Sequence, residues 1–298
     1  MVEFINFYLI PGLVLGCMYA LGAIGISMLF GILRFAHFAH GDVITLGAYF
    51  ALLFVTTFGF PVLLALPVAI VLTAIVSVLL DRSFYKPFRN SPTIYLVIAS
   101  FGVALMIRSL VQLFWGVKVE SYSSGTFSKP IIFFDTLRLA EKHMWIVGLT
   151  IVIVVALHYF LSRSKLGKAM RAMADEPDLA QVSGIPTEKV VRATWIIGGG
   201  LAATAGVFLG MDTQLHTNMG WDLLLPIFAA AILGGIGSPY GAIAGGLVIG
   251  LAEELSSYPW IGVEPLLSPG YKTGVAFALM VALLIWRPSG LFRGRVFT

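Results

Sequence analysis

The sequence has little charge and almost no cysteine. Its 298 residues include 19 Lys or Arg and 15 Asp or Glu, which is 11% charged residues, against roughly 25% in ordinary soluble domains. The single cysteine, Cys17, excludes an internal disulfide and a cysteine-based metal cluster. The chain also lacks a GxxxxGK[S/T] phosphate loop, so we do not expect it to hydrolyse ATP itself. No nucleophile–base motif links its Ser and His residues, which argues against a membrane-embedded enzyme.

Long apolar runs replace the missing charge. Hydrophobic residues make up 58% of the chain, and uncharged runs recur that are long enough to cross a hydrocarbon core of about 30 Å as helices. We therefore expect an all-α fold, a single polytopic membrane helix bundle over residues 1–298 with about eight to nine transmembrane segments, some short or broken. The predicted spans are 8–33, 38–58, 61–80, 93–115, 144–161, 193–211, 223–233, 242–255 and 271–286.

The Lys and Arg residues lie mostly on one side of these spans. Arg34, the loop 81–92, the segment 162–192 and the tail after Trp286 carry 13 of them, whereas the opposite loops carry five. Because cytoplasmic loops are enriched in Lys and Arg, the segment 162–192 and the C-terminus are expected in the cytoplasm. Counting back through the spans puts the N-terminus on the outer side of the membrane.

The hydrophilic segment 162–192 holds ten charged residues within 31 positions. Its apolar residues follow a helical period from Lys165 to Ala174. Pro177 suits the first turn of a second, short helix, and Gly184 suits its end. This pattern predicts a helix–turn–helix that presents Met, Leu, Val and Ile to a soluble partner. The alternative is an interfacial helix lying on the lipid surface, which the acidic start of the second helix disfavours.

Four stretches of the chain resemble one family. They are LGKAMRAMADEPDLAQVSGI at 166–185, FAHFAHGDVITLGAY at 35–49, ILGGIGSPYGAIAGGLVIGL at 232–251 and WRPSGLF at 286–292. Together they are similar to the LivH-type permeases of bacterial branched-chain amino acid ABC importers. The resemblance implies a permease subunit in the bacterial inner membrane that forms half of a pathway for branched-chain or other small neutral amino acids. Urea or short amides are the alternative cargo, and a stand-alone secondary transporter or channel is the alternative class.

The resemblance also implies partners and roles. The partners are a second permease subunit, homologous or identical, two cytoplasmic ATPase subunits that hold ATP and Mg²⁺, and a periplasmic substrate-binding protein. We expect membrane lipid around the chain, no cofactor on it and no nucleic acid partner. The residues expected to couple to the ATPase are Leu166, Gly167, Met170, Arg171, Met173, Pro177, Leu179, Ala180, Gly184 and Ile185.

Polar residues and glycines inside the spans are candidates for the translocation path. These are Arg108, Gln112, His40, Asp42, Gly234 and Gly235. Ionisable groups within a membrane usually face a bundle interior or an aqueous cavity, although Arg108 can alternatively extend to the outer interface. We expect no metal at His37, His40 and Asp42. Instead, Arg34 is expected to pair with Asp42, which then caps a helix after a break at Gly41.

Glycine-bearing interruptions at the cytoplasmic level, within 29–49 and 229–250, suggest an internal repeat.

Overall fold

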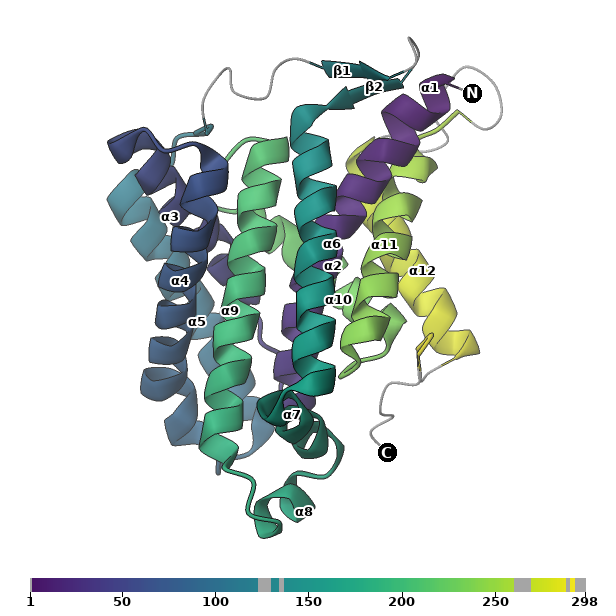
Figure 1. The fold of residues 1–298 in the computed structure, drawn as a ribbon. Coiled ribbons are helices and arrows are strands. Elements are labelled where there is room, and N and C mark those ends of the chain that lie inside the picture. The colour runs from purple at the N-terminus through teal and green to yellow at the C-terminus, as the bar shows by residue number, and fades with distance from the viewer. Residues whose placement is uncertain (1, 123–129, 134–136, 260–268, 288–289, 293–298) are drawn as a thin grey trace.

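Each long apolar run of the sequence forms a helix of one bundle (Figure 1). The computed structural model describes residues 2–122, 130–133, 137–259, 269–287 and 290–292. The helices are α1 (Val2–Phe4), α2 (Ile10–Leu33), α3 (His40–Phe58), α4 (Val62–Leu80), α5 (Thr93–Trp115), α6 (Glu141–Arg163), α7 (Lys165–Asp175), α8 (Pro177–Val182), α9 (Thr187–Asp212), α10 (Met219–Gly234), α11 (Pro239–Ser256) and α12 (Lys272–Trp286). Irregular helical turns are η1 (Ile5–Leu9), η2 (Asp81–Tyr85), η3 (Lys86–Phe88) and η4 (Pro269–Tyr271).

The predicted all-α membrane bundle is confirmed. Within the described residues, six helices are long and apolar enough to cross a membrane, and α10 and α12 are shorter apolar helices. The two spans predicted as short, 223–233 and 242–255, extend to 16 and 18 residues as α10 and α11. A small antiparallel hairpin joins β1 (Pro130–Phe133) to β2 (Leu137–Ala140), with Pro130 opposite Ala140. It lies at the end of the bundle opposite α7 and α8 (Figure 1).

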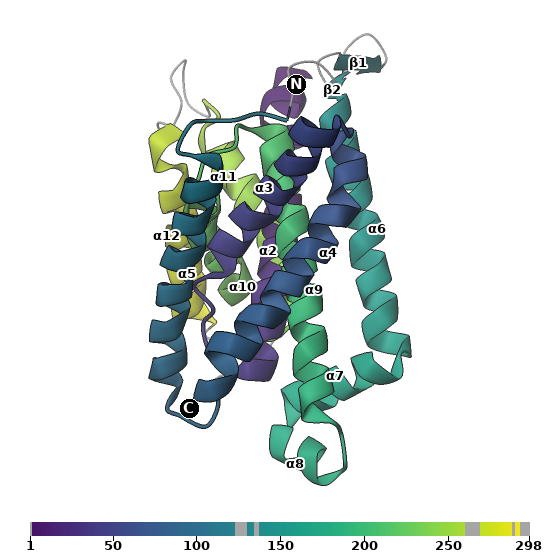
Figure 2. The same ribbon diagram turned by 90° about the vertical axis from the view of Figure 1, so that its left-hand side faces the viewer.

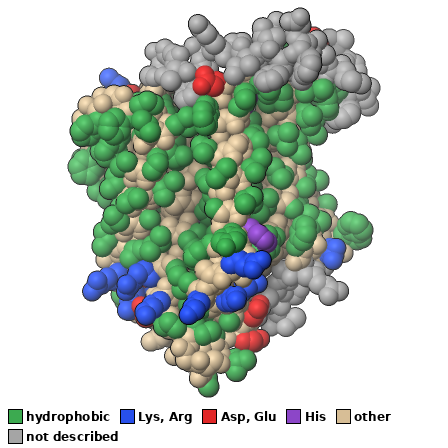
Figure 3. Space-filling view, viewed as in Figure 1, with side chains coloured by type: hydrophobic (Ala, Val, Ile, Leu, Met, Phe, Trp, Pro, Cys, Tyr) green, Lys and Arg blue, Asp and Glu red, His purple; other side chains and the backbone are tan. Residues whose placement is uncertain are grey.

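The helices differ in how much of their surface the chain itself covers. In the most apolar window of α2 and of α9, 83% of residues are buried, compared with 22% in α6. The two central helices therefore supply the core, while α6 and the outer faces of α4 and α5 remain apolar and exposed, as lipid-facing helices are. Figure 3 shows this apolar belt, with Lys and Arg side chains gathered toward the α7–α8 end.

Helix α3 begins inside the bundle instead of at its end. Arg34 ends α2 with a left-handed backbone (φ 57°), and residues 34–39 lead back along α2 without helical structure (Figure 2). At the start of α3, His40 packs so closely on Gly25 that a Cβ there would lie 2.8 Å from the imidazole. Since Gly25 precedes the end of α2 by eight residues, α3 starts about 12 Å inside the bundle.

Residues 213–218 form a second non-helical link of this kind, at the opposite end of the bundle. It follows α9 and leads to α10, whose Gly220 packs directly against the backbone of Gly41 near the start of α3. Thus α2–α3–α4–α5 and α9–α10–α11–α12 share one pattern: a long central helix, a six-residue interruption, a helix that begins inside, and two more helices. The two sets run in opposite directions (Figures 1 and 2). Interrupted helices at matching places of two inverted halves are typical of transporters.

The predicted repeat is therefore corrected in two respects. The counterpart of the first interruption is 213–218, whereas 229–250 contains the tight turn between α10 and α11. The first interruption also does not stay at the end of the bundle, because it leads back inside. Neither feature could be predicted from the sequence, because a six-residue non-helical link has the same local pattern as a surface loop. Only the residues packed around it in the fold distinguish the two.

Candidate translocation pathway and coupling surface

Arg108 on α5 forms an ion pair with Asp42 on α3. Its Nε donates to Asp42 Oδ1 at 2.9 Å and its Nη2 to Oδ2 at 3.2 Å. The Asp42 side chain is 1% exposed and that of Arg108 is 19% exposed. The structure thus directs Arg108 into the bundle instead of toward the outer interface. A charged pair at this depth is stable only when each partner satisfies the other.

Neighbouring groups hold this pair in place. The guanidinium of Arg108 lies 5.0 Å from the centre of the Trp221 ring on α10, a geometry that attracts a cation to the aromatic face. One turn further along α5, Gln112 donates to the Thr217 hydroxyl at 3.3 Å. The cluster therefore joins α5 to the starts of both α3 and α10.

Two predictions about Asp42 are wrong. Its cation is Arg108 and not Arg34, and no side chain of the described residues caps the start of α3. Gly41 does not break a helix either, since it lies in the first turn of α3. Its role is close approach: a Cβ on Gly41 would collide with the Gly220 carbonyl. The Thr45 hydroxyl secures this crossing by accepting from Gly220 N at 3.0 Å.

The remaining path candidates do not join this cluster. His40 is buried against Gly25 of α2. Gly234 and Gly235 lie at the opposite end of α10, about 22 Å along the helix from Met219 at 1.5 Å per residue. There Gly234 packs against the backbone of Gly241 in the first turn of α11. In the described part of the chain, no three His, Cys, Asp or Glu side chains converge as a metal site.

The second interruption is held by backbone bonds and a buried phenol. Glu120 and Leu215 exchange two backbone hydrogen bonds of 2.9 and 2.8 Å, and the Tyr122 hydroxyl donates to the Ala48 carbonyl at 2.8 Å. Burial raises the pKa of Tyr122 well above its usual range. The hydroxyl therefore stays protonated and keeps donating to α3.

Helices α7 and α8 project from the end of the bundle (Figures 1 and 2). The Ser164 hydroxyl caps α7 by accepting from Gly167 N at 2.8 Å, Pro177 begins α8 as predicted, and Gly184 follows it with φ 81°. Gly167 permits the sharp corner after α6, because a Cβ there would collide with the Phe160 carbonyl.

Only part of the predicted coupling set faces outward. Gly167, Met170, Met173 and Ala180 are buried within the chain, and Leu166, Pro177 and Ile185 are half-buried, whereas Arg171, Leu179 and Gly184 are exposed. The expectation that the methionines face a partner is wrong, because they pack α7 onto the bundle. The sequence placed Val182 on the second helix but not in the coupling set, although it is the most exposed of these apolar side chains at 86%, with Leu179 at 65%.

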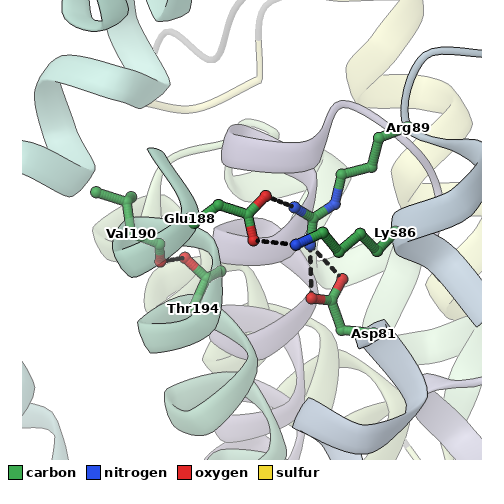
Figure 4. A network of polar contacts seen from close by, with 6 residues as sticks. All are labelled: Asp81, Lys86, Arg89, Glu188, Val190 and Thr194. Carbon is green, nitrogen blue, oxygen red and sulfur yellow. Dashed lines mark hydrogen bonds and ion pairs between the residues drawn. The ribbon is translucent and has the colours of Figure 1, made fainter. Parts of the chain in front are cut away.

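A polar network fixes the base of this projection (Figure 4). Glu188, in the first turn of α9, accepts from Arg89 at 2.8 Å and from Lys86 at 3.0 Å. Arg89 also donates to Asp81 at 2.6 Å, which links the loop between α4 and α5 to the helix that follows α8. Sequence reasoning missed this network. The charges of 81–89 were its only signal, and nothing in the chain order joins them to Glu188.

Comparison with known proteins agrees with this architecture. The family model for the permease component of branched-chain amino acid transport systems matches residues 8–284. The chain is 33% identical to the high-affinity branched-chain amino acid transport system permease protein LivH of Escherichia coli, over 94% of this chain and 92% of that protein. It is 31% identical to the corresponding permease protein BraD of Pseudomonas aeruginosa, over 95% and 94%.

A solved structure shows the same fold. PsaBC from Streptococcus pneumoniae, in complex with a Fab, superposes with a TM-score of 0.51, covering 95% of this chain and 93% of that one. At 14% identity this likeness concerns the fold alone. A family match over nearly the whole chain, together with inverted halves of interrupted helices, leads to one conclusion: this multi-pass membrane protein belongs to the permease components of branched-chain amino acid transport systems.

Proposed function

We propose that this chain forms half of the translocation pathway of an ATP-driven importer for branched-chain amino acids. It is a single transmembrane domain that carries a coupling segment at 162–192, and it pairs with a second permease subunit, identical or homologous. ATP and Mg²⁺ act on two separate ATPase subunits, and a binding protein delivers the cargo. The family match over residues 8–284 is the observation that carries this proposal.

In this proposal, α7 and α8 are the element that the ATPase subunits receive. Leu179 and Val182 are apolar yet exposed on a projection that also carries Arg171, and exposed apolar groups rimmed by charge favour a protein partner. The Lys and Arg side chains gather at the same end (Figure 3), which supports a cytoplasmic position for α7, α8 and the end of α12. The N-terminus, at the other end, is then periplasmic.

The buried methionines define how movement passes into the bundle. Met170 and Met173 pack α7 against the chain, and the Arg89–Glu188 contact links the start of α9 to the α4–α5 loop. Closure of the ATPases therefore moves α7, α9 and the α4–α5 loop together. The two interruptions, at 34–39 and 213–218, are the places where α3 and α10 reorient between outward-open and inward-open states.

The experiment compares Val182→Asp with Val119→Asp in the complex purified with its partner subunits and binding protein. Both valines are exposed, but Val119 lies in the link after α5, at the other end of the bundle. We expect Val182→Asp to lose copurifying ATPase and ATP-dependent leucine uptake, while Val119→Asp retains both. Equal behaviour of the two variants would contradict the coupling assignment.

The same vesicles test the cargo and the class. If wild-type vesicles accumulate labelled leucine, isoleucine and valine only when ATP is present on the side of the membrane that carries the ATPase subunits, the result supports an ATP-driven importer. Uptake of urea or a short amide in place of the amino acids would assign the alternative cargo. Uptake by the purified chain without ATPase subunits would instead indicate a stand-alone transporter or channel.

A further inference from the structure

The first turns of α10 carry polar side chains that the chain leaves exposed. Asn218 and Asp222, four residues apart, lie on one side of the helix, and Leu225 continues this exposed side. The Asp222 side chain is 64% exposed, and its nearest cationic candidate is His216, at 3.9 Å. Asp222 is thus a carboxylate that no Lys or Arg among the described residues pairs with.

Asp222 nevertheless lies at membrane depth. Two residues before it, Gly220 packs on the Gly41 backbone, and Asp42 next to Gly41 is held by Arg108. Arg108 precedes the end of α5 at Trp115 by seven residues, about 10 Å along the helix. A charged side chain that faces hydrocarbon is costly, and such groups usually face a bundle interior or a water-filled cavity. This exposed side of α10 therefore borders an aqueous or protein-lined space.

Arg108 presents the opposite charge beside this side of α10. Its Nε and Nη2 are bound to Asp42 and its face is covered by Trp221. Its Nη1 has no hydrogen bond to the described residues, and the side chain remains 19% exposed. Trp221, which contacts Arg108, is next to Asp222 in the sequence. The guanidinium of Arg108 and the carboxylate of Asp222 therefore lie beside the same turn of α10.

Apolar side chains border both charged groups. Leu105, one turn before Arg108 on α5, is exposed, as is Leu225, one turn after Asp222 on α10. Beyond them, Phe38 stacks on Phe101 at 4.3 Å and lies 5.3 Å from the Phe228 ring. An aliphatic group placed between the two charges finds apolar surface next to them.

We propose that Arg108 and Asp222 form a recognition site for the zwitterion of the cargo amino acid. The free Nη1 edge of Arg108 binds the α-carboxylate, Asp222 binds the α-ammonium group, and Leu105 and Leu225 contact the aliphatic side chain. Trp221 keeps the guanidinium oriented. This site rests on the proposed function, and it adds that cargo is selected in the membrane by carrying both charges, which urea and short amides lack.

The test uses Asp222→Asn in the complete reconstituted importer, with Glu3→Gln as a matched control. Both carboxylates are exposed, but Glu3 lies in α1 at the end of the chain. Loss of a charge-assisted contact to the ammonium group predicts about a tenfold fall in maximal leucine uptake. The concentration of loaded binding protein giving half-maximal uptake stays unchanged, and so do assembly and ATPase activity stimulated by the binding protein.

Each other outcome overturns the site. Unchanged maximal uptake with a salt-sensitive rise in the half-maximal concentration would make Asp222 a docking residue for the binding protein. Loss of the partner permease from the purified complex would make it an assembly contact, and uptake equal to that of Glu3→Gln would leave it no part in transport. If wild-type vesicles take up no branched-chain amino acid, the proposed function itself fails, independently of Asp222.

Discussion

Arg108 and Arg89 each bind a carboxylate from another element, yet their surroundings differ. Arg108 holds Asp42, which is 1% exposed, at the place where α3 and α10 begin. Arg89 holds Asp81 and Glu188 at the end of the bundle, and the Glu188 side chain is 55% exposed. Water can replace the lost contacts of Glu188 but not those of Asp42. The first pair is therefore suited to hold α3 and α5 together inside the bundle, and the second to link α9 to the α4–α5 loop at its surface.

Removing Arg108 should have the largest effect on stability. Arg108→Gln leaves Asp42 as an unpaired buried charge, which costs about 3–5 kcal/mol. The double variant Asp42→Asn with Arg108→Gln removes both charges, and we expect it to recover much of this loss. Thermal unfolding of the purified complex in detergent measures both. A double variant no more stable than Arg108→Gln would show that the pair is not the cause.

The next largest effect is expected from Gly220→Ala. The added methyl group collides with the Gly41 carbonyl, so α10 must shift away from α3, at a cost of about 1–3 kcal/mol. Gly102→Ala on α5 is the matched control, because a Cβ there meets no atom of the described residues within 4 Å. The same melting experiment compares them. Equal melting temperatures would mean that the contact between the two halves is adaptable.

Arg89→Gln should affect coupling more than stability. It removes the hydrogen bonds to Asp81 and Glu188, and we expect a loss of about 1–2 kcal/mol. Since the link between α9 and the α4–α5 loop is lost, ATP hydrolysis should continue while leucine uptake falls. The measurement is the number of ATP molecules hydrolysed per leucine transported. An unchanged ratio would exclude this network from coupling.

Lys86→Gln is the smallest change in the series. The Lys86–Glu188 bridge of 3.0 Å joins two half-exposed side chains, and such pairs contribute about 0.2–1 kcal/mol. We expect a small stability loss that disappears in high salt, because salt screens exposed charges. If Lys86→Gln impaired transport as strongly as Arg89→Gln, the distinction between the two contacts of Glu188 would be lost.

Much of the fold was predictable because membrane helices are marked by length and apolarity. The nine predicted spans lie on α2–α6 and α9–α12, and Pro177 and Gly184 bound α8 as expected. The two interruptions were not predictable as buried features. Segment 213–218 is polar enough to read as a loop, and only its bonds with Glu120 and the contact of Gly220 with Gly41 place its end inside the bundle.

The candidate site likewise has features that were predictable from the sequence and others that depend on how the helices pack. Hydropathy was enough to single out Arg108 and Asp42, because charge inside the spans is scarce, and local pattern was enough to predict a helix pair within 162–192. The packing of the helices was needed to learn that Arg108 pairs with Asp42, that Met170 and Met173 face inward, and that Val182 and Asp222 stay exposed. The physical reason is that local pattern and hydropathy depend on near neighbours in the chain. Pairing and exposure depend on contacts between residues such as 42 and 108, which only packing brings together.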